Sequence, residues 1–163
     1  MDAILKEQAI DTVYAESFAL DTKEWDTWLD LYTEDATYWM PAWKNEQEQT
    51  TDPACEISLI YYGNRSGLED RVFRLRTELS FASAPLFRTA HLNSNFRVSE
   101  GDNDEIIVNS SWQTNAYRLG KTLMSFGIQE HRLRKTDQGL KICYRKITLN
   151  NDIVDSVLDV YCI

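Results

Sequence analysis

The sequence predicts an α+β cone in which N-terminal helices pack on a curved antiparallel sheet. Near the N-terminus, apolar residues recur at helical spacing with no glycine or proline between them. Most of the second half alternates apolar and polar residues over long stretches that short polar turns separate. Strands joined in this way form a meander, and a meander must curl to bury one face against helices.

The N-terminal segment predicts two helices. Apolar side chains follow a helical spacing over residues 4–20, at Leu5, Ala9, Val13 and Phe18. Asp21 and Glu24 then have the spacing of a capping box, which predicts that a second helix begins at Asp21 and continues to Leu31.

A strand, a loop and a second strand come next. Residues 36–40 alternate in strand fashion, and Pro41 either ends the strand or marks a sheet edge. Residues 44–53 are polar and acidic, so they form an exposed loop, either an ordinary surface loop or a flap over a partner or ligand. An apolar run at residues 59–62 predicts the next strand.

The central stretch SLIYYGNRSGLEDRVFRLRTE, residues 58–78, combines a sharp turn with a charged helix. Breaks are expected at Gly63-Asn64 and again at Gly67. The helix should begin at Leu68, with apolar residues at Leu68, Val72 and Leu75. Such a helix is either simply a solvated amphipathic helix or, given its many arginines, part of a protein interface. A further break is expected at residues 82–85.

The second half predicts four strands. They cover residues 89–99, 106–119, 123–134 and 140–149, with a change of phase in the first that suggests a bulge. Val108, Trp112 and Ala116 should share one face of the second strand. In the last strand, Ile142 and Tyr144 should face opposite to Cys143 and Arg145.

Composition excludes several classes of function. The 163 residues fit one domain, residues 1–163, and the net charge of −9 argues against nucleic acid or an anionic membrane as partner. No apolar run is long enough to span a bilayer, so a cytoplasmic protein is expected. The three cysteines are widely spaced, which favours reduced structural thiols over a disulfide framework.

Acid-base chemistry has four candidate residues, which are Asp35, Tyr38, His91 and His131. Each also has a structural interpretation. Asp35 at a helix-to-strand junction can bond nearby backbone donors. His91 lies on a strand rich in hydrogen-bonding side chains, and His131, between two charged residues, is expected to face solvent or an interface.

The chain lacks the ligand patterns of redox centres. A mononuclear non-haem iron site needs two histidines and a carboxylate, and a Rieske cluster needs two cysteines and two histidines. Only two histidines are present, and neither lies near a cysteine. No glycine-rich dinucleotide fingerprint follows a strand.

Four stretches carry a resemblance to a known family. They are SLIYYGNRSGLEDRVFRLRTE, WDTWLDLYTEDATYWMPAW at 25–43, RTAHLNSNF at 88–96 and KITLNNDIVDSVLDVYCI at 146–163. Together they resemble the small (beta) subunit of aromatic-ring-hydroxylating dioxygenases, in the branch acting on benzoate, toluate and anthranilate.

The resemblance implies a fold, a role and partners. The fold would be the nuclear-transport-factor-2-like cone. The chain would be a non-catalytic structural subunit without a cofactor of its own, in an oxygenase that dihydroxylates an aromatic carboxylate with O2 and NADH-derived electrons. The large (alpha) subunit would carry a Rieske [2Fe-2S] cluster and a mononuclear Fe(II). An α3β3 hexamer built on a trimer of this chain, and a reductase that binds transiently, would complete the system.

Subunit contacts are expected from aromatic and arginine side chains, which interfaces favour. The interface hypothesis comprises Trp39, Trp43, Tyr61, Tyr62, Arg65 and Arg71. Two alternatives stay open: a free-standing isomerase or dehydratase with Asp35 and His91 as its acid-base pair, and a ligand-binding scaffold of the same fold.

Overall fold

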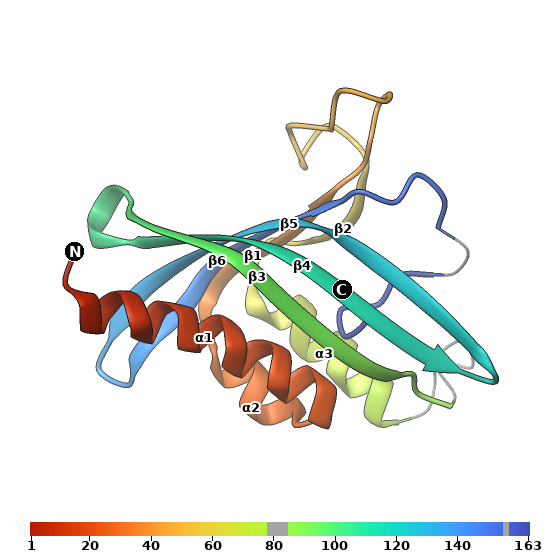
Figure 1. Ribbon diagram of the computed structural model, residues 1–163, viewed down its shortest axis with the longest axis horizontal. Helices are drawn as coiled ribbons and strands as arrows, with labels where there is room; N and C mark the ends of the chain where they lie inside the picture. The colour runs from red at the N-terminus through yellow and green to blue at the C-terminus, as the bar shows by residue number, and fades with distance from the viewer. Residues whose placement is uncertain (78–84, 155–156) are drawn as a thin grey trace.

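The computed structural model describes residues 1–77, 85–154 and 157–163. Its helices are α1 (Ala3–Thr22), α2 (Trp25–Asp30) and α3 (Arg65–Arg76), with a short 3₁₀ turn, η2 (Asp102–Asp104). Its strands are β1 (Tyr32–Pro41), β2 (Ser58–Tyr62), β3 (Arg88–Glu100), β4 (Ile106–Arg118), β5 (Lys121–Thr136) and β6 (Gly139–Leu149). Figure 1 shows the helices on one side of a single curved sheet, which confirms the predicted α+β cone.

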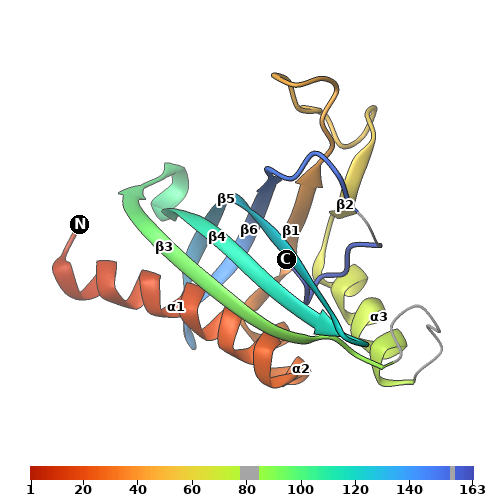
Figure 2. The ribbon, with the colours of Figure 1, turned by 45° about the vertical axis from the view of Figure 1, so that its right-hand side comes forward.

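The sheet is mixed, because its first strand joins its last. The strand order is β2-β1-β6-β5-β4-β3, and β3 to β6 form the predicted antiparallel meander. β1 runs parallel to β6, with Trp39 opposite Lys146, and antiparallel to β2, with Trp39 opposite Tyr61. The strong curvature seen in Figure 2 lets one face wrap around the helices.

The first helix is longer than the sequence suggested. Asp2 caps α1 by accepting a hydrogen bond from the Ile4 amide at 3.3 Å, and Lys23 ends it in a left-handed conformation. The prediction that Asp21 begins a second helix is wrong, since Asp21 lies in the last turn of α1. α2 starts after Glu24, whose side chain makes no capping bond.

The central helix also begins earlier than expected. Asn64 caps α3 by accepting from the Ser66 amide at 3.1 Å, and Leu68, Val72 and Leu75 are buried as predicted. The predicted break at Gly67 is wrong, because this glycine lies inside α3. A Cβ atom there would come within 2.3 Å of the Tyr62 ring, so close packing accounts for the glycine.

The long strands contain two irregularities. The expected bulge in β3 is confirmed by a register shift between Ser94 and Arg97. A second shift in the β5–β6 pairing, at Cys143, was not foreseen. It changes the phase of β6, so Arg145 is buried on the same side as Ile142, and the predicted opposition of these two residues is wrong.

The hydrophobic core lies between the helices and the concave face of the sheet. The predicted inward face of β4 is confirmed, since Val108, Trp112 and Ala116 are all buried. The largest fully buried side chains include Trp28, Tyr32, Tyr38, Tyr161, Leu20, Met40, Leu68 and Leu133. Residues 44–48 are exposed as expected, while Thr50 is buried and its hydroxyl accepts from the Ala42 amide at 3.0 Å.

The break at residues 82–85 falls mostly on residues 78–84, outside the described part of the chain. In the described ranges, no helix is both long and apolar enough to cross a bilayer.

Candidate functional site: a buried charge network

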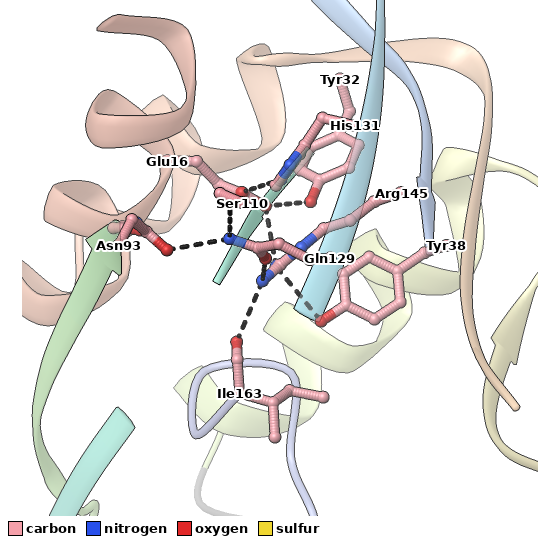
Figure 3. Close-up of polar contacts among 10 residues, drawn as sticks. Glu16, Tyr32, Tyr38, Asn93, Ser110, Gln129, His131, Arg145 and Ile163 are labelled. Atoms are coloured by element: carbon pink, nitrogen blue, oxygen red, sulfur yellow. Dashed lines mark hydrogen bonds and ion pairs between the residues drawn. The ribbon is translucent and has the colours of Figure 1, made fainter. Parts of the chain in front are cut away.

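A buried ion pair joins α1 to the concave face of the sheet. The Glu16 carboxylate accepts from Arg145 Nη1 at 2.9 Å, and its other oxygen lies 2.8 Å from His131 Nε2. The Tyr32 hydroxyl donates to the same carboxylate. Glu16, His131 and Arg145 are only 1%, 0% and 3% exposed. Figure 3 shows these side chains converging inside the cone.

A shell of polar groups surrounds the ion pair. Gln129 accepts from Arg145 Nη2 at 2.9 Å and donates to Ser110 Oγ at 3.1 Å and to Asn93 Oδ1 at 2.8 Å. Arg145 Nη2 also donates to the carbonyl oxygen of Ile163 at 3.4 Å. The network therefore connects α1, β1, β3, β4, β5, β6 and the C-terminal segment. Among the described residues, His131 Nδ1 and Arg145 Nε have no hydrogen-bond partner, while the other contacts of the network favour one arrangement of the elements they join.

The charges of the network balance. Burial alone would raise the pKa of Glu16, but Arg145 and His131 outweigh it and lower that pKa to about 2. Burial lowers the pKa of His131, so its ring is neutral near pH 7 and donates through Nε2 to the carboxylate. Arg145 stays charged, because the pull of Glu16 and the tyrosines raises its pKa despite burial. The result is one carboxylate neutralised by one guanidinium.

Local structure explains why a charged network lies in the core. Glu16 shares the buried face of α1 with Ala9, Val13 and Leu20, so it points at the sheet. On β5, the two-residue period places His131 inward between two outward-facing neighbours. The sequence analysis missed Glu16 and Arg145. The available signal was a carboxylate on an otherwise apolar helix face, which requires a buried cation as partner.

The proposed acid-base pair of Asp35 and His91 is not formed. Asp35 is exposed and binds Arg134 Nη1 at 3.0 and 3.2 Å. His91 instead binds Asp21, with 2.6 Å between Nδ1 and Oδ1 and 2.9 Å between its amide nitrogen and Oδ2. The pairing with Asp21 follows from the last turn of α1 lying beside β3, an extension of α1 that the sequence analysis did not anticipate.

The other two acid-base candidates belong to the buried network. Tyr38 is fully buried, and burial raises its pKa; its hydroxyl oxygen lies 3.4 Å from Arg145 Nη1. The expectation that His131 faces solvent or an interface is wrong, because the strand period carries it inward although both neighbours are charged. Tyr38 and His131 are both buried inside the cone, away from the open geometry that proton transfer to a substrate needs.

The six residues of the interface hypothesis fall into two groups. Trp43, in the loop after β1, and Tyr61, on β2, are 40% and 44% exposed, and Trp43 Nε1 donates to the Leu149 carbonyl at 2.6 Å. The other four are less exposed and also make contacts within the chain. Trp39 donates to Ser58 Oγ at 2.9 Å, and Tyr62 packs against Gly67. Arg65 donates to the Tyr32 carbonyl at 3.1 Å, and Arg71 Nε donates to Asp159 Oδ1 at 2.8 Å. Their role between subunits stays a prediction.

The donor set does not fit a Rieske cluster or a mononuclear iron. The two histidines lie on different strands, and each is bound to a carboxylate of α1, His91 to Asp21 and His131 to Glu16. Among the described residues, no group of three or more histidine, cysteine, aspartate or glutamate side chains could hold a metal ion. The three cysteines are unpaired, with Cys55 exposed and the other two buried.

The fold and its buried ion pair define a class of protein, an α+β cone with a charged network in its core. Solved structures of this shape include naphthalene 1,2-dioxygenase with indole bound, at a TM-score of 0.79, 16% identity and coverage of 99% of this chain and 86% of that one. The family described as "Ring hydroxylating beta subunit" matches residues 15–156. The chain therefore belongs to the beta subunits of ring-hydroxylating dioxygenases, and the resemblance noted in the sequence is confirmed.

Individual relatives are similar over nearly their full length. The beta subunit of benzoate 1,2-dioxygenase from Acinetobacter baylyi is 40% identical, over 99% of this chain and 95% of its own. The toluate 1,2-dioxygenase beta subunit from Pseudomonas putida is 43% identical, with 93% of each chain covered. The crystal structure of the benzoate 1,2-dioxygenase beta subunit from Burkholderia mallei has a TM-score of 0.79 at 39% identity, with 95% of each chain covered.

Proposed function

We propose that this chain is the non-catalytic small subunit of the terminal oxygenase component of a Rieske non-haem iron dioxygenase. Its substrate would be an aromatic carboxylate of the benzoate or anthranilate type, dihydroxylated during aromatic compound catabolism. The observation that carries this proposal is the full-length similarity to subunits named for benzoate, toluate, 2-halobenzoate and anthranilate, at 38–43% identity.

The interior of the cone supports a structural role. Its carboxylate, guanidinium and imidazole groups are buried and bonded to one another. The isomerase or dehydratase alternative requires Asp35 and His91 to act together, and each of them is bound to a different partner.

The metals and the electron supply belong, on this proposal, to other chains. The large (alpha) subunit would hold the Rieske [2Fe-2S] cluster and the mononuclear Fe(II), because the histidines of this chain are committed to Asp21 and Glu16. A reductase would bind transiently and deliver electrons from NADH. Metal-ligand chemistry supports this division, since both centres need histidine ligands that are free to converge.

Assembly and location complete the proposal. Residues 1–163 would form one cone-like domain, three copies would form a trimer, and three large subunits would add to give an α3β3 hexamer. The exposed rings of Trp43 and Tyr61 suit such contacts. Unpaired cysteines and a net charge of −9 suit a cytoplasmic protein that binds neither nucleic acid nor anionic membranes.

Native mass spectrometry with iron analysis tests the proposal. The chain is produced alone and together with the large subunit of a benzoate-type dioxygenase. We expect an iron-free assembly of this chain alone, and an iron-containing complex with equal numbers of both subunits when they are produced together. Failure to bind the large subunit, or turnover of a substrate by the isolated chain, would overturn the proposed role.

A further inference from the structure

A small pocket surrounded by exposed aliphatic side chains lies beyond the C-terminal end of β6. Its volume is about 150 Å³, and its walls include Phe87, Leu123, Met124, Leu149, Leu158 and Cys162. At its rim, Ile153 and Val157 are 72% and 81% exposed. A cavity of about this volume can hold one benzene ring, so the pocket is large enough for a single apolar side chain. Exposed aliphatic groups around a pocket are typical of a protein contact.

Three cations lie beside this pocket, and one exposed carboxylate, Asp152, lies between its lining residues Asn151 and Ile153. Arg118 lies opposite Lys121 at the end of the β4–β5 hairpin, and Arg88 lies opposite Tyr117 on the neighbouring strand. The Arg118 guanidinium is 4.1 Å from the centre of the Phe87 ring, which forms one wall of the pocket. A partner for this surface should therefore present an apolar side chain among carboxylates.

The loop between β1 and β2 carries an exposed apolar side chain and several exposed carboxylates. Ile57 is 77% exposed, and the carboxylates of Glu46, Glu48 and Asp52 are exposed in the same loop. The cation of the loop, Lys44, is already paired with Glu56. Figures 1 and 2 both show this loop projecting from the sheet, apart from the end of the β4–β5 hairpin.

We propose that these two surfaces join copies of this chain head to tail, with Ile57 of one copy entering the pocket of the next. The inference rests on the proposed function, in which the chain forms a trimer, and it names the surfaces that build that trimer. Because the two surfaces differ, the contact is heterologous, and such contacts close into a ring when the rotation between copies permits. Charge complementarity between the basic pocket end and the acidic loop selects a second copy as the occupant.

Charge reversal tests the contact by sedimentation of the chain alone. One variant combines Arg88→Glu with Lys121→Glu, and another combines Glu46→Lys with Glu48→Lys; all four side chains are exposed. We expect each variant to weaken trimer formation at least about tenfold, and the chain carrying all four substitutions to regain the trimer. Lys6→Glu with Arg97→Glu makes the same charge change elsewhere on the surface and should leave the trimer intact.

A second variant tests the apolar half of the contact. Ile57→Asp should dissociate the trimer, whereas Ile4→Asp, at another exposed isoleucine, should not. Trimers that survive both charge-reversal variants, or a wild-type chain that is monomeric alone, would overturn the inference. Variants that stay trimeric but no longer bind the large subunit would overturn it too, and would assign the pocket to that subunit. In each of these cases, binding of the large subunit by the wild-type chain would leave its proposed role as the small subunit standing.

Discussion

The carboxylate of Glu16 stabilises the core, because it is the counter-charge of the buried Arg145 guanidinium. Replacing Glu16 by Gln keeps the shape but leaves Arg145 buried without an anion. We expect the free energy of unfolding to fall by about 3 kcal/mol. Urea denaturation followed by circular dichroism measures this loss.

Asp35→Asn provides a matched control for that experiment. It removes a carboxylate from an exposed pair with Arg134, and such pairs contribute less than about 1 kcal/mol. Equal losses in the two variants would mean that burial does not set the strength of the Glu16 contact.

The same cluster predicts how stability depends on pH. The folded-state pKa of Glu16, about 2, lies below its ordinary value of 4.5, so its contribution is present above pH 4.5 and is lost as pH falls towards 2. The pKa of His131 is also lowered, from 6.5, so the unfolded state takes up a proton first as pH falls below 6.5. Acid should therefore destabilise the protein in two stages.

His131→Gln separates these two stages, because an amide can donate to Glu16 without titrating. We expect the variant to lose the pH dependence of the melting temperature just below pH 6.5 and to keep the dependence below pH 4.5. An unchanged profile between pH 7 and 5 would contradict the assignment to His131. His91→Gln is the control at the other histidine, which binds Asp21.

The contacts of individual side chains were hard to predict because their partners lie far away in the sequence. The pattern of charges around His131 predicted exposure, yet the strand period buried it against Glu16, 115 residues away in sequence. Asp35 and His91 matched a chemical pairing but lie on elements that the fold does not bring into contact. The absence of an iron ligand set, in contrast, could be argued from the two histidines alone.

Among the helices and strands, α3 shows how packing can override local propensity. Gly67→Ala would normally favour a helix by about 1 kcal/mol. Here the new Cβ meets the Tyr62 ring within 2.3 Å, so we expect a net loss of about 1–3 kcal/mol. Thermal unfolding of the variant measures the balance.

Asp70→Ala is the matched control in the same helix, since Asp70 is exposed. It should change stability by less than about 0.5 kcal/mol. A Gly67→Ala variant more stable than the wild type would show that Tyr62 can move aside and that the close contact does not require glycine.

Most element boundaries followed from periodicity and turn residues, while the exceptions have tertiary causes. The apolar spacing of α3 and the alternation of β4 were sufficient to predict these two elements, because each element buries one face. The bulge at Cys143 and the parallel pairing of β1 with β6 leave no local pattern. Asp21 matched a capping box, but the Lys23 left-handed cap places the helix end two residues later.

For the assembled chain, the pair between Arg71 and Asp159 links α3 to the C-terminal segment. Asp159 is buried, so Arg71→Met removes a cation that binds it and should loosen residues 157–163. Hydrogen exchange of those residues should become at least about tenfold faster, which corresponds to about 1.4 kcal/mol. Arg74→Met, on an exposed position of the same helix, should change little.

This experiment also tests the original interface hypothesis for Arg71. If the arginine contacts another subunit directly, Arg71→Met should weaken assembly while exchange in residues 157–163 stays slow. If its role is to hold the C-terminal segment, the two effects should appear together.

The exposed ring of Tyr61 predicts a direct effect on assembly. Tyr61→Ala should weaken binding of the large subunit about tenfold or more, because truncated aromatic anchors cost about 1–4 kcal/mol at interfaces. Tyr14→Ala removes a similarly exposed ring from α1 and serves as the control. Equal affinities for the two variants and the wild type would remove Tyr61 from the interface.

The parallel pairing of β1 with β6 has a consequence for synthesis of the chain. β1 leaves the ribosome early, but its neighbour in the sheet follows roughly 100 residues later, which is roughly 5–20 s at ordinary rates of translation. Until then only β2 can pair with β1, and the nascent chain carries an unpaired strand edge. Glu16 is also without its counter-charge, because Arg145 on β6 has not yet been synthesised. The nascent chain should therefore depend on chaperones until its last strand emerges, and folding should be slow because the decisive contacts are distant in sequence.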